Sequence, residues 1–178
     1  MMQGRRICAL VQGDVRVSDE PDVVMTTTLG SCVAACLFDV RRGLGGMNHF
    51  LLPDRPGSAD GPGAAAQRYG VHLMELLING LLTRGASRAH LQAKVFGGAC
   101  ITDGLTDAGG RNAAFVEHFL RHEEIPLVAR SLGGRRGRRV QFCPASGRAR
   151  QILCDPVEAA PPRAPAGAVQ WGELEMFQ

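Results

Sequence analysis

Residues 26–38 read TTTLGSCVAACLF, and residues 47–52 read MNHFLL. The apolar runs Val33–Phe38 and Met47–Leu52 are typical of two short β-strands, and the turn-like residues 39–43 (DVRRG) join them. Folding of this hairpin is expected to bring Cys32, at the start of the first run, close to His49 in the second.

Cys32 and His49 are the residues at which we expect chemistry. An unperturbed thiol has a pKa of about 8.5, and only its thiolate is a nucleophile. A neighbouring imidazole can take the thiol proton and so activate it. Taken alone, such a pair is more often a buried thiol and a hydrogen-bonded core histidine. A catalytic interpretation of these two residues therefore requires further evidence from the rest of the sequence.

The remaining sequence predicts two helices among several short strands. Apolar residues recur at helical spacing from Ala64 to about Thr83, and a second helix is expected at about Asn112 to His122. Strands are predicted at residues 7–11, 15–17, 91–96, 125–129, 140–142 and 151–153, and from residue 23 into the threonines. A hairpin turn is expected at residues 144–147, and residues 57–63 form a glycine-rich loop that is a candidate substrate-facing flap.

The length of 178 residues fits one folded domain followed by a tail. We expect this domain to span residues 1–155, because the sequence then becomes too rich in Pro and Ala to pack. Residues 156–178 are predicted to form a flexible C-terminal tail. It carries an acidic and aromatic stretch, Trp171–Phe177, which either docks on a partner or folds back on the domain.

Composition argues against several classes of protein. The chain has no apolar run long enough for a membrane span and no signal peptide, so we expect a cytoplasmic protein without membrane insertion. Six cysteines without a C-x-x-C pair favour free thiols over disulfides or structural zinc. The net charge is only +3, and the cluster Arg135–Arg139 is interpreted as a solvated loop rather than a nucleic-acid site.

Six short motifs follow one another between residues 23 and 153. They are residues 28–34 (TLGSCVA), 47–53 (MNHFLLP), 69–70 (YG), 94–99 (KVFGGA), 110–112 (GRN), and 132–134 (LGG) with 137–139 (GRR). In order and spacing this set resembles the CheD family, the chemoreceptor glutamine deamidases of bacterial chemotaxis. The resemblance implies an α/β (α+β) fold, in which a layered sandwich of mixed β-sheets is flanked by two main helices in a single domain.

The resemblance also implies an active site made of a cysteine, a histidine and a threonine. Position by position, the nucleophile falls on Cys32, the base on His49 and the threonine on Thr26. Because three threonines stand in a row, Thr27 and Thr28 remain open for the third role. The implied enzyme is a protein-glutamine glutaminase, which needs no cofactor or metal and converts receptor glutamines to glutamates through a thioester.

Two nearby residues are candidates for stabilising the oxyanion of this reaction. Gly30 permits unusual backbone conformations, so the turn Gly30-Ser31-Cys32 is a candidate source of amide donors together with the Ser31 hydroxyl. Arg111 and Asn112 either cap the second helix or border the substrate cleft, and the cap is the preferred interpretation.

The expected partners are methyl-accepting chemotaxis receptors, with a CheC-like phosphatase as a further candidate. The alternatives are a non-catalytic module that binds such a phosphatase, and another cysteine amidohydrolase or acyltransferase.

Overall fold

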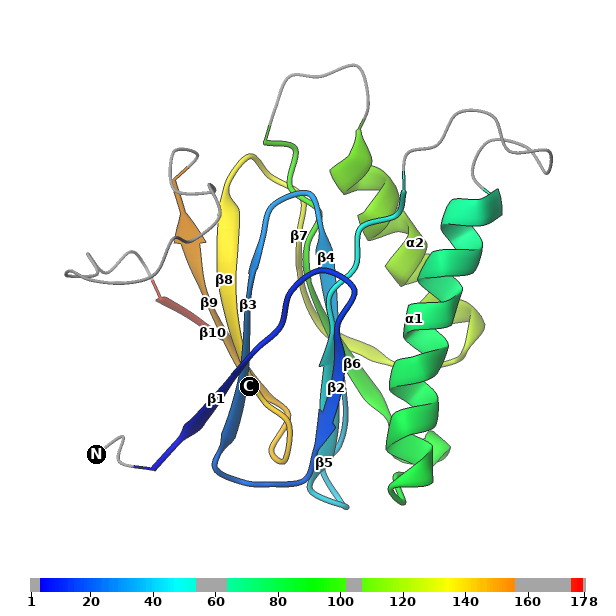
Figure 1. Ribbon diagram of the computed structural model, residues 1–178, viewed down its shortest axis with the longest axis vertical. Helices are drawn as coiled ribbons and strands as arrows, with labels where there is room; N and C mark the ends of the chain where they lie inside the picture. Colours follow the sequence, from blue (N-terminus) through cyan, green and yellow to red (C-terminus); the bar gives the residue numbers. More distant parts are fainter. Residues whose placement is uncertain (1–3, 54–63, 102–106, 156–173, 178) are drawn as a thin grey trace.

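Two β-sheets pack face to face, and two helices cover the outer face of the second sheet (Figure 1). The computed structural model describes residues 4–53, 64–101, 107–155 and 174–177. The first sheet has the strand order β1-β3-β8-β9-β10, and the second has the order β2-β5-β4-β6-β7. This arrangement confirms the predicted layered sandwich of mixed sheets with two main helices.

Each sheet combines antiparallel pairs with one parallel pair. In the first sheet β1 runs parallel to β3, and in the second β6 runs parallel to β7. The strands of the first sheet are β1 (Arg6–Ala9), β3 (Val23–Leu29), β8 (Gly137–Cys143), β9 (Arg148–Cys154) and β10 (Leu174–Phe177). Those of the second sheet are β2 (Val15–Ser18), β4 (Val33–Asp39), β5 (Leu44–Asn48), β6 (Gln92–Gly97) and β7 (Leu127–Leu132).

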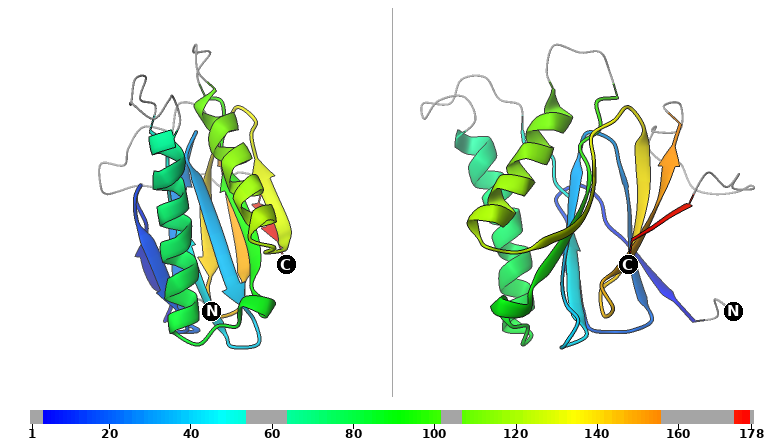
Figure 2. Two further views of the ribbon diagram at one scale, coloured as in Figure 1. Left: turned by 90° about the vertical axis from the view of Figure 1, so that its right-hand side faces the viewer. Right: turned by 180° about the vertical axis from the view of Figure 1, so that it is seen from behind.

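Both helices lie side by side on the second sheet, as the turned views show (Figure 2). Helix α1 spans Ala64–Thr83, which confirms the predicted range, and it buries the face that carries Leu73, Leu77 and Leu81. Helix α2 spans Ala108–His122 and begins four residues before the predicted start. The reason is its cap, because the Asp107 side chain accepts a hydrogen bond from the amide of Gly110 at 2.8 Å. The predicted capping role of Asn112 is therefore wrong. A short 3₁₀ turn, η1 (Arg88–His90), precedes β6.

Strand β5 differs most from its prediction. It was expected at residues 47–52, but it covers Leu44–Asn48 and pairs antiparallel with both β2 and β4. Glycines usually weaken strands, which hid this one. Here they are needed for close packing, because a Cβ at Gly45 would collide with Pro144 and one at Gly46 would lie 2.6 Å from the Arg16 carbonyl oxygen.

The molecule has two apolar layers. One lies between the second sheet and the helices and includes Leu37, Met74, Leu77 and Leu120. The other lies between the two sheets and includes Met25, Leu29, Phe96 and Phe142. Strand β4 serves both, since its odd-numbered residues face the helices and its even-numbered residues face the first sheet.

Two sequence predictions concern regions that are only partly described. The candidate flap at residues 57–63 lies outside the described residues. Of the predicted tail, Leu174–Phe177 forms β10 and pairs antiparallel with β9, so this stretch folds back on the domain. The division of the chain at residue 155 stays a prediction.

Candidate active site

The threonine run lies in β3, where side chains alternate between the two faces of the sheet. Met25 and Leu29 belong to the layer between the sheets, and Thr27 is in phase with them and buried. The Thr27 hydroxyl oxygen lies 2.8 Å from Nδ1 of His49. Thr26 instead donates a hydrogen bond to the carbonyl of Val140, at 3.0 Å. The histidine contact predicted for Thr26 is therefore made by Thr27, because a shift of one residue exchanges the faces of a strand.

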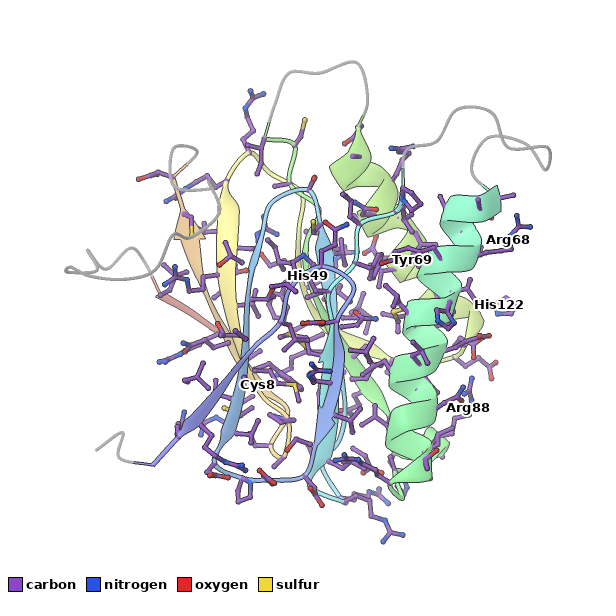
Figure 3. All side chains as sticks on the ribbon, viewed as in Figure 1. Cys8, His49, Arg68, Tyr69, Arg88 and His122 are labelled. Carbon is purple, nitrogen blue, oxygen red and sulfur yellow. The ribbon has the colours of Figure 1, made fainter. Side chains whose placement is uncertain are left out.

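His49 lies just after β5, and its backbone is held by the loop between β1 and β2. Its amide donates to the carbonyl of Asp14, and its carbonyl accepts from the amide of Gly13 at 2.7 Å. The side chain is 6% exposed and lies between the two sheets (Figure 3). Two hydrogen bonds thus hold the backbone of His49, and Thr27 holds its imidazole.

Cys32 reaches the same layer from the start of β4. Val33 and Phe50 exchange both backbone hydrogen bonds at 2.9 Å, in the register of the β4–β5 ladder. In this register Cys32 and His49 are diagonal neighbours on one face, a relation with a typical separation of about 7–8 Å between Cα atoms. Cys32 is half-buried and packs against the layer between the sheets. The register thus places the two side chains on the same face of the second sheet, without a hydrogen bond between them.

The hydrogen bonds of Thr27 define the tautomer of His49. A threonine hydroxyl has one proton, and that of Thr27 is donated to the carbonyl of Leu10 at 2.8 Å. The hydroxyl oxygen therefore accepts from His49, which places the imidazole proton on Nδ1. Nε2 then carries the lone pair. It is buried and has no hydrogen-bond partner among the described residues. This is the form in which an imidazole acts as a base.

Burial shifts both members of the pair toward their neutral forms. It raises the pKa of the Cys32 thiol, an effect that the backbone N–H of Cys32 partly opposes. Burial also lowers the pKa of His49, against smaller opposing effects of the Leu10 carbonyl and of Asp14. A neutral thiol and a neutral imidazole are therefore the resting state, rather than a preformed ion pair.

The second cysteine of this region is unsuited to the same chemistry. Cys36 is fully buried in the layer between the sheets, and burial strongly raises the pKa of its thiol. Only Cys32 of these two combines partial exposure with a position beside the imidazole, which favours it as the nucleophile.

The turn that carries Cys32 packs against a second turn at Gly97 and Gly98. The amide of Gly98 donates to the Cys32 carbonyl at 2.8 Å, and a Cβ at Gly97 would collide with that same oxygen. Gly97 has a φ of +113°, which favours glycine. Gly30 does not have a left-handed conformation, contrary to the expectation, and a Cβ there would meet the side chain of Ile101. Space rather than backbone freedom explains glycine at position 30.

Three residues around the site were missed by sequence reasoning or misinterpreted. Gln12 brings its side-chain oxygen to 3.9 Å from the Cys32 sulfur, and no motif marks it. Asn112 is buried and bonds the Cys32 turn rather than capping α2. Arg138 was assigned to a solvated loop, but it lies in β8, is 4% exposed and donates to the carbonyls of Gly97, Ser131 and Gly133. Arg138 thus braces the Gly97 turn behind Cys32.

Neither a metal site nor a membrane span is found in the parts of the chain that are described. Those residues contain no group of three or more His, Cys, Asp or Glu side chains suited to hold a metal ion. None of the described helices is both long enough and apolar enough to cross a membrane.

Comparisons with known proteins agree on one family. The model of the family described as "CheD chemotactic sensory transduction" matches residues 51–151. A protein of Caulobacter sp. (strain K31), named "Probable chemoreceptor glutamine deamidase CheD", is 56% identical over 94% of this chain and 91% of its own length. A protein of the same name from Acidiphilium cryptum (strain JF-5) is 58% identical over 81% of this chain and 76% of its own.

Solved structures give only a distant likeness. The Bacillus licheniformis hypothetical protein YfiH aligns with a TM-score of 0.42 and 15% identity, over 72% of this chain and 60% of that one. This likeness carries no weight in the assignment. The family model matches only residues after His49. The alignment with the Caulobacter protein covers 94% of this chain, so the unaligned residues at the two ends are too few to include Cys32 or His49. The chain belongs to the CheD family.

Proposed function

We propose that this protein is a protein-glutamine glutaminase that deamidates glutamine side chains of methyl-accepting chemotaxis receptors, with release of ammonia. The names of the relatives, chemoreceptor glutamine deamidases, support the substrate. The observation that carries the chemistry is the contact of Thr27 with Nδ1 of His49, which places the imidazole proton on Nδ1 and leaves Nε2 to act as the base for Cys32.

The first step is general-base activation of the thiol. Nε2 of His49 takes the proton of Cys32 as the sulfur attacks the side-chain carbonyl carbon of the substrate glutamine. Burial raises the pKa of Cys32 and lowers that of His49, so charge separation at rest is unfavourable and the proton moves as the C–S bond forms. The Thr27 hydroxyl accepts from Nδ1–H and stabilises the imidazolium that forms.

The remaining steps release ammonia and restore the enzyme. The imidazolium gives its proton to the departing nitrogen, the C–N bond breaks, and a thioester between Cys32 and the substrate remains. His49 then takes a proton from water, which attacks the thioester carbonyl. The C–S bond breaks, the imidazolium returns the proton to the Cys32 sulfur, and the product is glutamate. The net reaction adds one water and releases one ammonia, without a redox change or a cofactor.

The direct test is mass spectrometry of a receptor cytoplasmic fragment that is incubated with the protein. Native protein is expected to convert specific glutamines to glutamates with matching release of ammonia, and Cys32→Ala is expected to abolish both. Cys143→Ala is the matched control, because it also removes a half-buried thiol. Cys143 lies at the opposite end of β8 from Arg138, which bonds the Gly97 turn behind Cys32. The Cys143→Ala variant is expected to retain full activity.

The outcomes separate the alternatives. Ammonia release by Cys32→Ala contradicts the proposed nucleophile. If native protein leaves every receptor glutamine intact but hydrolyses small amides or esters, the chain is another cysteine hydrolase. If it has neither activity but binds a CheC-like phosphatase, it is a binding module. A cytoplasmic location and a CheC-like partner remain predictions of the sequence.

A further inference from the structure

Asn112 joins the two segments that carry the candidate catalytic pair. It lies in α2, and its side chain is almost completely buried, at 1% exposure. Its Nδ2 donates to the carbonyl of Ser31 at 2.8 Å, one residue before Cys32. Its Oδ1 accepts from the amide of Leu52 at 2.9 Å, three residues after His49. Both polar atoms of this side-chain amide therefore bond to backbone groups close to the catalytic pair.

The bond to Ser31 also orients an N–H group. The carbonyl of Ser31 and the amide N–H of Cys32 belong to one planar trans peptide and point in opposite directions. Asn112 holds the carbonyl toward α2, so the N–H of Cys32 is directed away from α2. This N–H interacts with the sulfur of its own side chain, where it favours the thiolate and lowers the pKa. Because the N–H and the sulfur belong to the same residue, the N–H lies next to the point of attack.

The neighbouring peptides are held in the same way, but by the backbone. The carbonyl of Gly30 accepts from the amide of Ala99 at 2.9 Å, and that of Cys32 accepts from the amide of Gly98 at 2.8 Å. Among the described residues, the Ser31 carbonyl is the member of this trio that is held by a side chain. The orientation of this one peptide thus depends on the identity of residue 112.

We propose that Asn112 is a positioning residue, which aims the Cys32 N–H at the oxyanion formed when the sulfur attacks the substrate amide. The inference rests on the proposed deamidase function and adds to it a donor and the residue that fixes this donor. The N–H is a donor next to the nucleophile, on the residue whose sulfur attacks, and so can stabilise the developing negative charge. A hydrogen bond to the carbonyl of the same peptide also polarises it and strengthens the N–H as a donor.

The test compares deamidation with simple alkylation of the same thiol. Deamidation forms an oxyanion, whereas displacement of iodide from iodoacetamide by Cys32 does not. For Asn112→Ala we expect kcat on the receptor fragment to fall about 10- to 100-fold, since a fully lost oxyanion donor costs about 10²–10³. KM is expected to stay within about threefold of the native value, because the lost interaction forms in the transition state. The alkylation rate is expected to fall less than about threefold, because the N–H has only a minor effect on the pKa of the thiol.

Two further variants separate positioning from folding. Asn112→Asp keeps an acceptor for the Leu52 amide, but its ionised carboxylate has no proton for the Ser31 carbonyl. It is expected to lose kcat as Asn112→Ala does. Asp107→Ala removes the cap of α2 without touching the Cys32 turn. It is expected to lower Tm while kcat stays at the native value.

Each other result overturns a defined statement. Native kcat in both Asn112 variants contradicts the positioning role, and so does an alkylation rate that falls in parallel with kcat. Failure of both variants to fold, measured by circular dichroism, shows that the amide is required for the fold instead. A native protein that releases no ammonia contradicts the proposed deamidation itself, and it does so before any variant is compared.

Discussion

The layer between the two sheets and the layer between the second sheet and the helices bury different kinds of residue. Between the sheets, the buried residues include Thr27, His49, Lys94 and Arg138 beside apolar side chains. Under the helices, the core is built mainly from aliphatic residues, and the buried amides of Asn48 and Asn112 bond to backbone groups. The polar side chains of the candidate catalytic group, Thr27 and His49, thus lie in the layer between the sheets, and the helix layer supports them from behind. Apart from Asn112, which bonds the Cys32 turn, changes in the helix layer should therefore act on stability, and changes around His49 should act on activity.

After removal of the nucleophile Cys32 itself, the largest effect on activity is expected from His49→Ala. Burial raises the pKa of Cys32, so the thiol stays protonated when its base is removed. General-base catalysis contributes about 10²–10⁴-fold, and we expect kcat/KM to fall about 10³-fold. The measurement is ammonia release from a receptor fragment, with circular dichroism to verify folding. A folded variant that retains a tenth of the native activity would contradict the assignment of the base.

In the helix layer, Leu77→Ala is expected to act on stability alone. Leu77 is fully buried on α1 against the second sheet, and such truncations cost about 2–5 kcal/mol in the free energy of unfolding. Urea denaturation measures this loss. At a temperature where the variant is folded, kcat should equal that of the native protein. A matching loss of kcat would mean that the two layers are not separable.

A smaller effect is expected from a matched pair in β3. Thr27→Val removes the hydroxyl that accepts from His49, and we expect kcat to fall about tenfold, comparable to one lost hydrogen bond of about 1.4 kcal/mol. Thr26→Val removes a bond to the Val140 carbonyl on the neighbouring strand and should change kcat less than threefold. Kinetics of the two variants under identical conditions decide between them. The reverse order would restore Thr26 as the orienting residue.

The smallest effect is a displacement of the pH profile. Burial lowers the pKa of His49 below the ordinary value of about 6.5, and the protonated imidazole cannot take the thiol proton. As the pH falls, kcat/KM should therefore stay level through about 6.5 and decline only at lower pH. The same shift makes the folded state less stable at acid pH, because the unfolded chain binds the proton more readily. An acid limb centred at or above about 6.5 would show that His49 is not in the environment described.

The sequence predicted the parts of the fold that have a clear periodicity. Helix α1 was predicted at its observed bounds, because its apolar residues recur without interruption. Strand β5 was placed too late, because the glycines that let it pack against Pro144 and β2 resemble a turn. The sequence did not decide whether the stretch that forms β10 folds back on the domain. Its pairing with β9 is a long-range contact, which no local pattern encodes.

The candidate site was predictable to a similar degree. The spacing of Cys32 and His49 on two adjacent strands predicted that they lie near each other. Met25 and Leu29 face the layer between the sheets, and strand alternation would have predicted the same face for Thr27. Asn112 and Arg138 were misinterpreted because each acts on backbone carbonyls of residues far away in the sequence. Such bonds depend on the approach of main-chain segments, which side-chain patterns do not reveal.

The position of β3 between β1 and β8 has a consequence for biosynthesis. The ladder that fixes the threonine run joins Met25 to Phe142, and Arg138, which braces the turn behind Cys32, also lies in β8. Most of the chain must leave the ribosome before these long-range contacts can form, and contacts of this kind form slowly. During synthesis the threonine run therefore lacks its partner strand, and the Gly97 turn lacks its bond from Arg138, until β8 has left the ribosome.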